Sequence, residues 1–450
     1  MNFSRLLALV LSVVLATQAW ATDVGGPVIS NTTWTLAGSP YVVTNAIIVG
    51  GNATLTIQPG VTVKFNAGLG ITVGSQAWGI GTLKAIGTAG QKITFTSNTN
   101  PGQPGQWKDI FFTDRCIDAG FDGGGAYLSG STLQHCLVEF AGGGAAGSGA
   151  VTISQSSPFI NFCEVRNNAR SGIYADNTTT APLAPILQIK NSNIHQNNAG
   201  FSQSGGGANL SVTGLLFTGN TMSSNTAPPG RSGGGLSAEL RGSNSTHTVS
   251  GNTITNNSAP NGSGGGMYVQ TPGTSTTCTF SNNIVSNNTA SVGGGIYIIE
   301  VGGNNNVVFA HNGMLFSHES PIPTESDTRF FARTVLAHRA ADQIMGKPFQ
   351  GFLAHLIGGG NKLAFLDATG DISIVNSEYG VWQEGVWYSN TGYLAPPVFD
   401  YSRGTHDSEH SYSDLDLLPE DDWVRHNRKS GNWPDDDRVV ADWANTSGAF

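Results

Sequence analysis

The chain has 450 residues, of which 61 are glycine and only 11% are charged, and its formal net charge at pH 7 is −9. A mildly acidic chain without a basic patch is not expected to bind nucleic acid. Four cysteines are too few for a disulfide framework, and none has the Cys-x-x-Cys spacing of a metal site.

Residues 1–21 have the features of a secretory signal peptide. Arg5 precedes an apolar run from Leu6 to Ala16, and Ala19-Trp20-Ala21 provides a small-x-small cleavage pattern. The apolar run is too short to span a membrane. The sequence therefore predicts an exported protein, secreted or on the cell surface, that is cleaved after Ala21.

Residues 22–50 are expected to cap the first coil of a repeat structure, because an uncovered edge strand would pair with other chains. The segment Ala53–Phe65 alternates apolar and polar residues and turns at Pro59-Gly60, as two short strands would. Further short strands are predicted at Ile71–Val73, Leu83–Ala85 and Ile93–Thr96.

From Leu187 to Ile299 one pattern occurs four times: an apolar residue, an Asn-rich stretch, an alanine and a glycine triplet. The triplets begin at Gly205, Gly233, Gly264 and Gly293, with spacings of 28, 31 and 29 residues. Short β-branched and aromatic runs favour strands over helices. The sequence thus predicts an all-β fold, a parallel β-helix of about nine coils over residues 51–312, with one coil per repeat.

Stacking of coils would place equivalent residues on top of one another. The same position of successive repeats is occupied by Asn168, Asn197, Asn225, Asn257 and Asn288. Buried asparagines in one column can pair amide to amide, and asparagine also tolerates the left-handed backbone of a tight turn. These residues are therefore predicted to be structural.

Several segments have patterns that recur in one group of exported proteins. They are Gln58-Pro-Gly-Val-Thr-Val-Lys-Phe65, Gly81–Thr88, Lys92–Ser97, Phe217-Thr-Gly-Asn220, Phe280-Ser-Asn-Asn283 and Gly293-Gly-Gly-Ile296. The first three resemble the opening of bacterial right-handed parallel β-helix proteins of the pectate-lyase-like superfamily, and the others are similar to repeats of polymorphic outer-membrane proteins. The resemblance covers residues 30–312 and implies a right-handed helix.

The resemblance does not assign a function, because this fold carries unrelated activities. The chain lacks the paired aspartates with Gly-His-Gly of polygalacturonases, the Arg-Pro-x-x-Arg of pectate lyases and the Asp-Pro-His of alginate epimerases. No catalytic residue can be transferred from those enzymes.

One group of charged residues is predicted to gather on the outside of the coils. Glu139, Arg166 and His195 occupy the same position of three consecutive coils, each about 4.8 Å from the next. A carboxylate, a guanidinium and an imidazole in a row could bind an acidic sugar and transfer a proton. The alternative is a charge ladder that only joins the coils.

A second candidate ligand site contains Trp107, Asp109 and Arg115, beside a predicted loop. Trp107 could stack on a sugar ring, or it could close the core where the coil turns. Elsewhere, aligning Leu133–Val138 with Ile160–Val165 places Cys136 beside Cys163. Either a disulfide or two buried thiols would fit there.

The pattern changes near residue 313, and the part after it carries two-thirds of the 30 acidic residues. Residues 313–399 are predicted to form a mixed segment, and residues 400–450 an acidic, poorly ordered tail. The mixed segment is expected to contain a helix at Thr334–Ala341 and strands at Leu363–Leu366, Ile372–Val375 and Gly385–Tyr388.

No metal or other cofactor is predicted from this part of the chain. Asp367, Asp371 and Glu378 match a calcium loop weakly, because Ile372 stands where the loop needs glycine. The segment His406–His410 has the His-x-x-Glu-His pattern of zinc proteases, but its flanking residues do not favour the helix that such a site requires.

Three functions are compatible with the sequence. The first is an exported β-helix that binds polysaccharide or a cell-surface glycan without catalysis. The second is a polysaccharide lyase or glycoside hydrolase acting on an acidic glycan around Glu139, Arg166 and His195, and the third is a purely architectural surface protein.

Overall fold

The structure is a computed structural model that describes residues 21–302, except 145–146, 178–185 and 201–202, and residues 305–310. Beyond these it describes the strands β33 (Gly313–Leu315), β34 (His318–Glu319), β35 (Phe352–Leu356), β36 (Lys362–Leu366), β37 (Ile372–Asn376), β38 (Gly380–Gln383) and β39 (Val386–Ser389). The signal peptide up to residue 20, the helix expected at 334–341, the calcium-loop residues and the His406–His410 segment lie outside the described residues.

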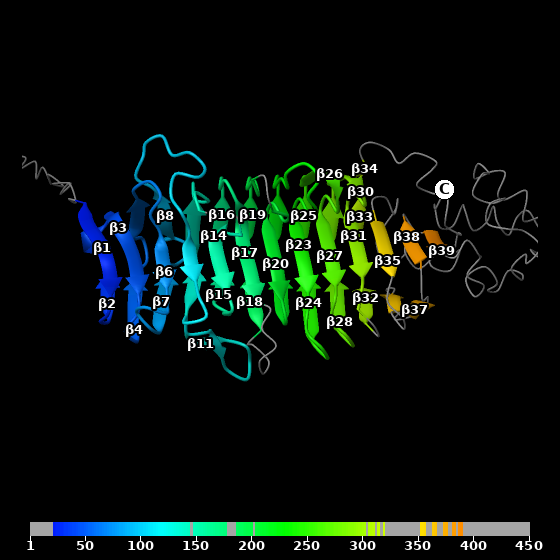
Figure 1. The fold of residues 1–450 in the computed structure, drawn as a ribbon, viewed down its shortest axis with the longest axis horizontal. Coiled ribbons are helices and arrows are strands. Elements are labelled where there is room, and N and C mark those ends of the chain that lie inside the picture. The colour runs from blue at the N-terminus through cyan, green and yellow to red at the C-terminus, as the bar shows by residue number, and fades with distance from the viewer. Residues whose placement is uncertain are drawn as a thin grey trace, which may run out of the picture.

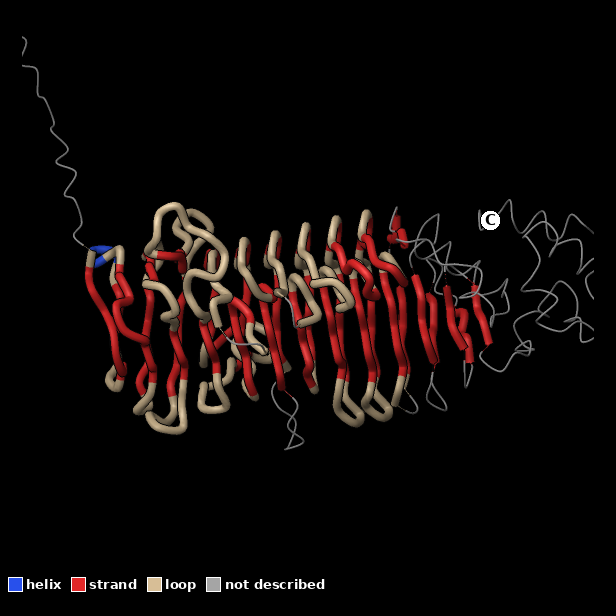
Figure 2. Tube along the Cα trace, turned by 45° about the horizontal axis from the view of Figure 1, so that its top comes forward, coloured by secondary structure: helices blue, strands red, loops and turns tan. Residues whose placement is uncertain are grey.

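The strands stack in three parallel rows along one axis (Figures 1 and 2). The first row within residues 51–312 contains nine described strands, in agreement with the predicted nine coils. They are β4 (Ala53–Ile57), β7 (Gly81–Ile86), β12 (Thr132–Gln134), β15 (Phe159–Asn161), β18 (Leu187–Lys190), β21 (Leu215–Thr218), β24 (Thr246–Ser250), β28 (Thr277–Ser281) and β32 (Asn306–Ala310). The predicted all-β parallel β-helix is thus confirmed.

The second and third rows complete each coil and are joined in one large sheet. The second row contains β5 (Thr62–Phe65), β8 (Ile93–Ser97), β13 (Cys136–Glu139), β16 (Glu164–Arg166), β19 (Asn193–His195), β22 (Thr221–Ser223), β25 (Thr253–Thr255), β29 (Ile284–Ser286) and β33. The third contains β6 (Ile71–Val73), β9 (Ile110–Phe112), β14 (Gly149–Ser154), β17 (Ser171–Asn177), β20 (Ala208–Val212), β23 (Leu236–Leu240), β27 (Met267–Thr271), β31 (Ile296–Glu300) and β35.

The core is made of in-register columns of apolar side chains. In the second row Val165, Ile194, Met222, Ile254 and Val285 follow one another on neighbouring strands, and none is exposed. Because side chains alternate along a strand, the residues on either side of each core residue face outward. Burial of one such side chain contributes about 1.5–3 kcal/mol, so the columns supply most of the driving force for stacking.

The predicted asparagine ladder is present at the corner between the second and third rows. The Nδ2 atoms of Asn168, Asn197, Asn225 and Asn257 donate to the Oδ1 atom of the next asparagine at 2.8, 3.0, 3.0 and 3.0 Å. One detail of the prediction is wrong. The left-handed backbone is adopted by the residue before each laddered asparagine, such as Gln196 at φ 55°.

A second ladder, which the sequence analysis missed, occupies the corner between the first and second rows. Asn220 donates to Asn252 at 3.1 Å, and Asn252 donates to Asn283 at 2.9 Å. The repeated Phe-x-x-Asn pattern contained the signal for it. Two corners of each coil in this part of the chain are therefore held by buried amides.

The glycine triplets allow coils to approach closely beside the first ladder. A Cβ atom on Gly206 would lie 2.5 Å from the carbonyl oxygen of Gly234, so no larger residue fits. Next to the triplets, Ala227, Ala259 and Ala290 form a small separate buried cluster. The loops here pair as a short parallel sheet of β26 (Ser258–Ser263), β30 (Thr289–Val292) and β34.

Parallel pairing begins before residue 51. β1 (Thr22–Val28) pairs with β3 (Tyr41–Val49), β2 (Thr32–Trp34) pairs with β4, and the 3₁₀ helix η1 (Leu36–Gly38) lies between β2 and β3. The edge strand β1 contains a register shift at Gly26 followed by Pro27, which lacks an N–H group. Both features discourage pairing with another chain.

Parallel pairing also continues beyond residue 313. β35 and β36 pair in parallel with β31 and β32, and β37, β38 and β39 then follow in antiparallel pairs. The strands β36, β37 and β39 confirm the three that were predicted in this segment, with ends shifted by one residue at most.

Coils differ in length mainly at the corner between the third and first rows. Three residues join β3 to β4, whereas a long segment joins β9 to β12 and contains the antiparallel pair β10 (Gly120–Phe121) and β11 (Tyr127–Ser129). Among the described residues, no helix has the length and apolarity needed to cross a membrane.

Cys136 and Cys163 lie on neighbouring coils as the alignment predicted, and both are free, buried thiols. Burial, together with the adjacent Cys163, raises the pKa of the Cys136 thiol well above its ordinary value. Of the two states that the sequence allowed, the structure contains the pair of thiols.

Replacement of Asn225 by alanine should lower the free energy of unfolding by at least about 3 kcal/mol, since it breaks bonds to Ile194, Asn197 and Asn257 and leaves buried polar groups unpaired. Urea denaturation measures this. Asn193→Ala, on the exposed side of β19, is the control and should change stability by less than about 0.5 kcal/mol. Equal effects of the two changes would contradict the role of the ladder.

His247 should make the protein less stable in acid. Burial lowers its pKa from 6.5 to about 4, and its Nδ1 atom has no hydrogen-bond partner. The neutral imidazole therefore favours the folded state above pH 6.5, and this contribution is lost as the pH falls from 6.5 to about 4. His247→Leu, which copies the in-register Leu215, should remove about 3 kcal/mol of pH dependence from unfolding curves over that interval.

Candidate functional site

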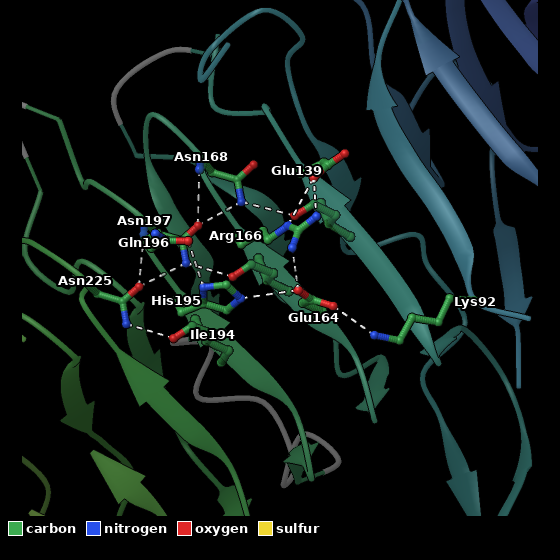
Figure 3. Close-up of polar contacts among 12 residues, drawn as sticks. Lys92, Glu139, Glu164, Arg166, Asn168, Ile194, His195, Gln196, Asn197 and Asn225 are labelled. Atoms are coloured by element: carbon green, nitrogen blue, oxygen red, sulfur yellow. Dashed lines mark hydrogen bonds and ion pairs between the residues drawn. The ribbon is translucent and has the colours of Figure 1, made fainter. Parts of the chain in front are cut away.

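The structure brings Glu139, Arg166 and His195 together as the sequence predicted. Glu139 of β13 is the register partner of Arg166 on β16, and Arg166 is the register partner of His195 on β19. All three point outward from the second row, because Val138, Val165 and Ile194 beside them point into the core (Figure 3).

Arg166 binds Glu139 through two nitrogens. Its Nε and Nη2 atoms donate to Oε2 of Glu139 at 3.1 and 3.0 Å. The other carboxylate oxygen of Glu139 accepts a hydrogen bond from the Thr96 hydroxyl at 3.1 Å. Both oxygens of this carboxylate are therefore engaged.

A second carboxylate, Glu164, lies at the centre of the cluster and was missed by the sequence analysis. Its Oε1 atom accepts a hydrogen bond from Nη1 of Arg166 at 2.9 Å and lies 3.4 Å from Nε2 of His195. Its Oε2 atom lies 2.8 Å from Nζ of Lys92 (Figure 3). We call Lys92, Glu139, Glu164, Arg166 and His195 the charged cluster.

Glu164 could have been found from the sequence, because it precedes Arg166 by two residues on one strand and must share its face. Lys92 could not, because the repeat pattern that sets the register is clear only after about residue 130, and the Lys92 side chain reaches across an intervening coil. The cluster thus extends over more coils than the three that were predicted.

The electrostatics of the cluster favour the ionised form of Glu164. Burial alone would raise the pKa of Glu164, but Lys92, Arg166 and His195 together lower it below its ordinary value. The Glu139 and Glu164 side chains are 13% and 19% exposed, whereas Arg166 and Lys92 are 34% and 42% exposed. Solvent therefore meets mainly cations at this surface.

Such a cluster is better suited to holding coils together than to moving protons. A general acid needs a raised pKa, and a general base needs a free lone pair that points toward a ligand. Glu164 has a lowered pKa, and all four carboxylate oxygens of the cluster already have partners. Remaining donor capacity on the two cations could bind an anionic group.

The second predicted group does not form a joint surface. Trp107 is wholly buried, stacks on Phe65 with ring centroids 4.1 Å apart, and donates from Nε1 to the Glu139 carbonyl at 2.7 Å. Its ring cannot stack on a sugar, so it fills the core role that was the alternative. The loop carrying Trp107 folds inward, and periodicity gave no sign of this.

Asp109 is also buried, and this burial raises its pKa, although Lys108 and a 3.0 Å hydrogen bond from the Thr152 hydroxyl oppose the shift. Of the predicted ligand-binding trio only Arg115 is exposed, with a long 3.6 Å contact to Asp114. Among the described residues no three His, Cys, Asp or Glu side chains are grouped as a metal site would require.

Comparison with known families agrees with this geometry. Residues 120–321 match the family model described as "Right handed beta helix region". The fold is therefore a right-handed parallel β-helix, as the sequence resemblance implied. No curated protein and no solved structure matches the chain significantly.

Replacement of Glu164 by glutamine should lower the free energy of unfolding by about 1 kcal/mol near neutral pH, because partly exposed ion pairs are worth little individually. The pKa of Glu164 is depressed in the folded state. The stabilisation by its ion pairs is therefore fully present at pH values above the ordinary pKa of a glutamate, and it is lost as the pH falls through the folded-state pKa. The difference from wild type should therefore shrink in acid. Asp114→Asn, in the loose exposed pair, is the control and should change nothing measurable in the same urea titrations.

Proposed function

We propose that this protein binds polysaccharide on the outward face of its second row of strands and does not cleave it. The observation that carries the proposal is the regularity of that face. Beyond His195 the same outward position is held by Ser223, Thr255 and Ser286. The outward position two residues earlier on each strand is held by Asn193, Thr221 and Thr253, and the exposed Ile284 follows them. Hydroxyl and amide groups repeated about every 4.8 Å suit a polymer whose hydroxyls also repeat.

The charged cluster supports binding over catalysis. It lies on the same row, at the end of the polar face, and its carboxylates are already paired. An acidic glycan could bind the outward cations without breaking the internal pairs. A lyase or hydrolase that used a carboxylate of the cluster would need it free, and both carboxylates are engaged in internal contacts.

The signal-peptide pattern of residues 1–21 supports a role outside the cell. We therefore infer that the ligand is an extracellular or cell-surface glycan. A purely architectural protein would need the same stacking, but it would not need rows of outward-facing hydroxyl and amide groups.

Retention of the purified protein on immobilised polysaccharides tests the proposal. The double variant Thr221→Ala/Thr253→Ala should weaken retention at least about fivefold, because two hydrogen-bonding groups are removed from the proposed face. Thr279→Ala, on β28 of the first row, is a matched control on another face and should bind like wild type.

The same samples distinguish the other two functions. Release of shortened or unsaturated products would show a hydrolase or a lyase and would contradict the proposal. Retention on no polysaccharide of a broad panel would favour an architectural role.

A further inference from the structure

The corner between the first and second rows contains one residue per coil whose backbone conformation favours glycine or asparagine. Its backbone is left-handed, with φ between 49° and 66°, in six consecutive coils. The residues are His135, Phe162, Asn191, Gly219, Gly251 and Asn282. Glycine and asparagine adopt this conformation readily, whereas it is strained for a bulky side chain. Four coils therefore carry the expected residue type, and two neighbouring coils do not.

The two exceptions form an aromatic pair. The rings of His135 and Phe162 are stacked with centroids 4.8 Å apart and planes inclined by 5°. Phe162 is 46% exposed, so burial in the core does not offset its backbone strain. Phe140 at the other laddered corner has φ 64° but packs against the core. Strain kept at an exposed position points to a function.

The aromatic pair borders the charged cluster. Phe162 stands two residues before Glu164 on the same coil, and His135 is adjacent in register to Lys92, since the N–H of Ile93 donates to the His135 carbonyl at 3.1 Å. The partly exposed Phe162 ring and the outward cations of the cluster are therefore neighbours in sequence and in register.

We propose that His135 and Phe162 form a stacking platform for a uronic acid residue of an acidic polysaccharide, with its carboxylate held by Lys92 and Arg166. The apolar face of a pyranose would cover the Phe162 ring, and the cations, which are more exposed than their carboxylate partners, supply the charge complementarity. This inference rests on the proposed function and names its ligand class and its anchor. Trp107, the aromatic residue that the sequence suggested for stacking, is buried and unavailable.

The decisive variant is Phe162→Asn, which installs the residue that the same corner uses at Asn191 and Asn282. Retention on an immobilised uronate polysaccharide should weaken at least about tenfold, because the variant removes the aromatic ring on which the sugar would stack. A tenfold loss corresponds to about 1.4 kcal/mol of binding free energy. The urea midpoint of unfolding should stay the same or rise, because asparagine relieves the left-handed strain. Loss of binding without loss of stability separates this platform from a structural aromatic pair.

Two controls accompany it. Asn282→Gly makes a permitted exchange at the same corner, far along the stack, and should leave retention unchanged. The same polysaccharide with its carboxylates reduced to alcohols should bind wild type more weakly, and Lys92→Gln should weaken only the binding of the acidic form.

Three results would overturn the inference. If Phe162→Asn bound like wild type, the platform would be wrong while the proposed function stood. If it unfolded at clearly lower urea, the ring would be structural. If wild type were retained on neither the acidic nor the reduced polymer, the proposed function itself would fail together with this site.

Discussion

The structure depends on one constraint, the buried asparagine amides that pair from coil to coil at the corners. Asn168 to Asn288 form a continuous file in which each amide is both donor and acceptor, and Asn220 to Asn283 repeat this at a second corner. A coil that slipped by one residue would leave its own asparagine amides, and those of its two neighbours that pair with them, buried without partners. The need to hydrogen-bond these buried amides thus fixes the register, while the apolar columns provide most of the stabilising free energy.

The fixed register also determines which side chains lie next to one another on the outer surface. Because coils cannot slide, outward residues at equal positions must line up, whether they are the hydroxyls of Ser223 and Thr255 or the charges of Glu139 and Arg166. The weakly charged middle of the chain then has a polar face from Asn193 to Thr253, which ends at Ile284. The coils that carry the charged cluster depart from this pattern, and the same coils carry His and Phe at a corner that elsewhere holds Gly or Asn. Because the charged cluster and the aromatic pair both interrupt the repeat in the same coils, we place the proposed binding site there.

The sequence predicted what repeats and missed what does not. The asparagine file and the Glu139–Arg166–His195 row followed from spacing alone, because stacking converts a period into contact. Lys92 was missed, since it lies in a coil whose register the sequence left open and its side chain reaches past the neighbouring coil to Glu164. For Trp107 the sequence left both a sugar-stacking role and a core role open, because nothing in a non-repeating loop indicates that its ring turns inward onto Phe65, far earlier in the chain. The exposure of the Phe162 ring likewise depends on the left-handed backbone of its turn, which the sequence pattern does not indicate.

The variable corner between the third and first rows has a separate consequence. Within the described coils it accepts a three-residue link after β3 and a long link with its own β-hairpin after β9, while the rows on either side remain in register. Residues inserted at this corner project outward from the side of the helix and do not push neighbouring coils apart. A scaffold of this kind can gain new loops one coil at a time, and a foreign peptide grafted into the β10–β11 segment would be displayed on a frame whose spacing it does not disturb.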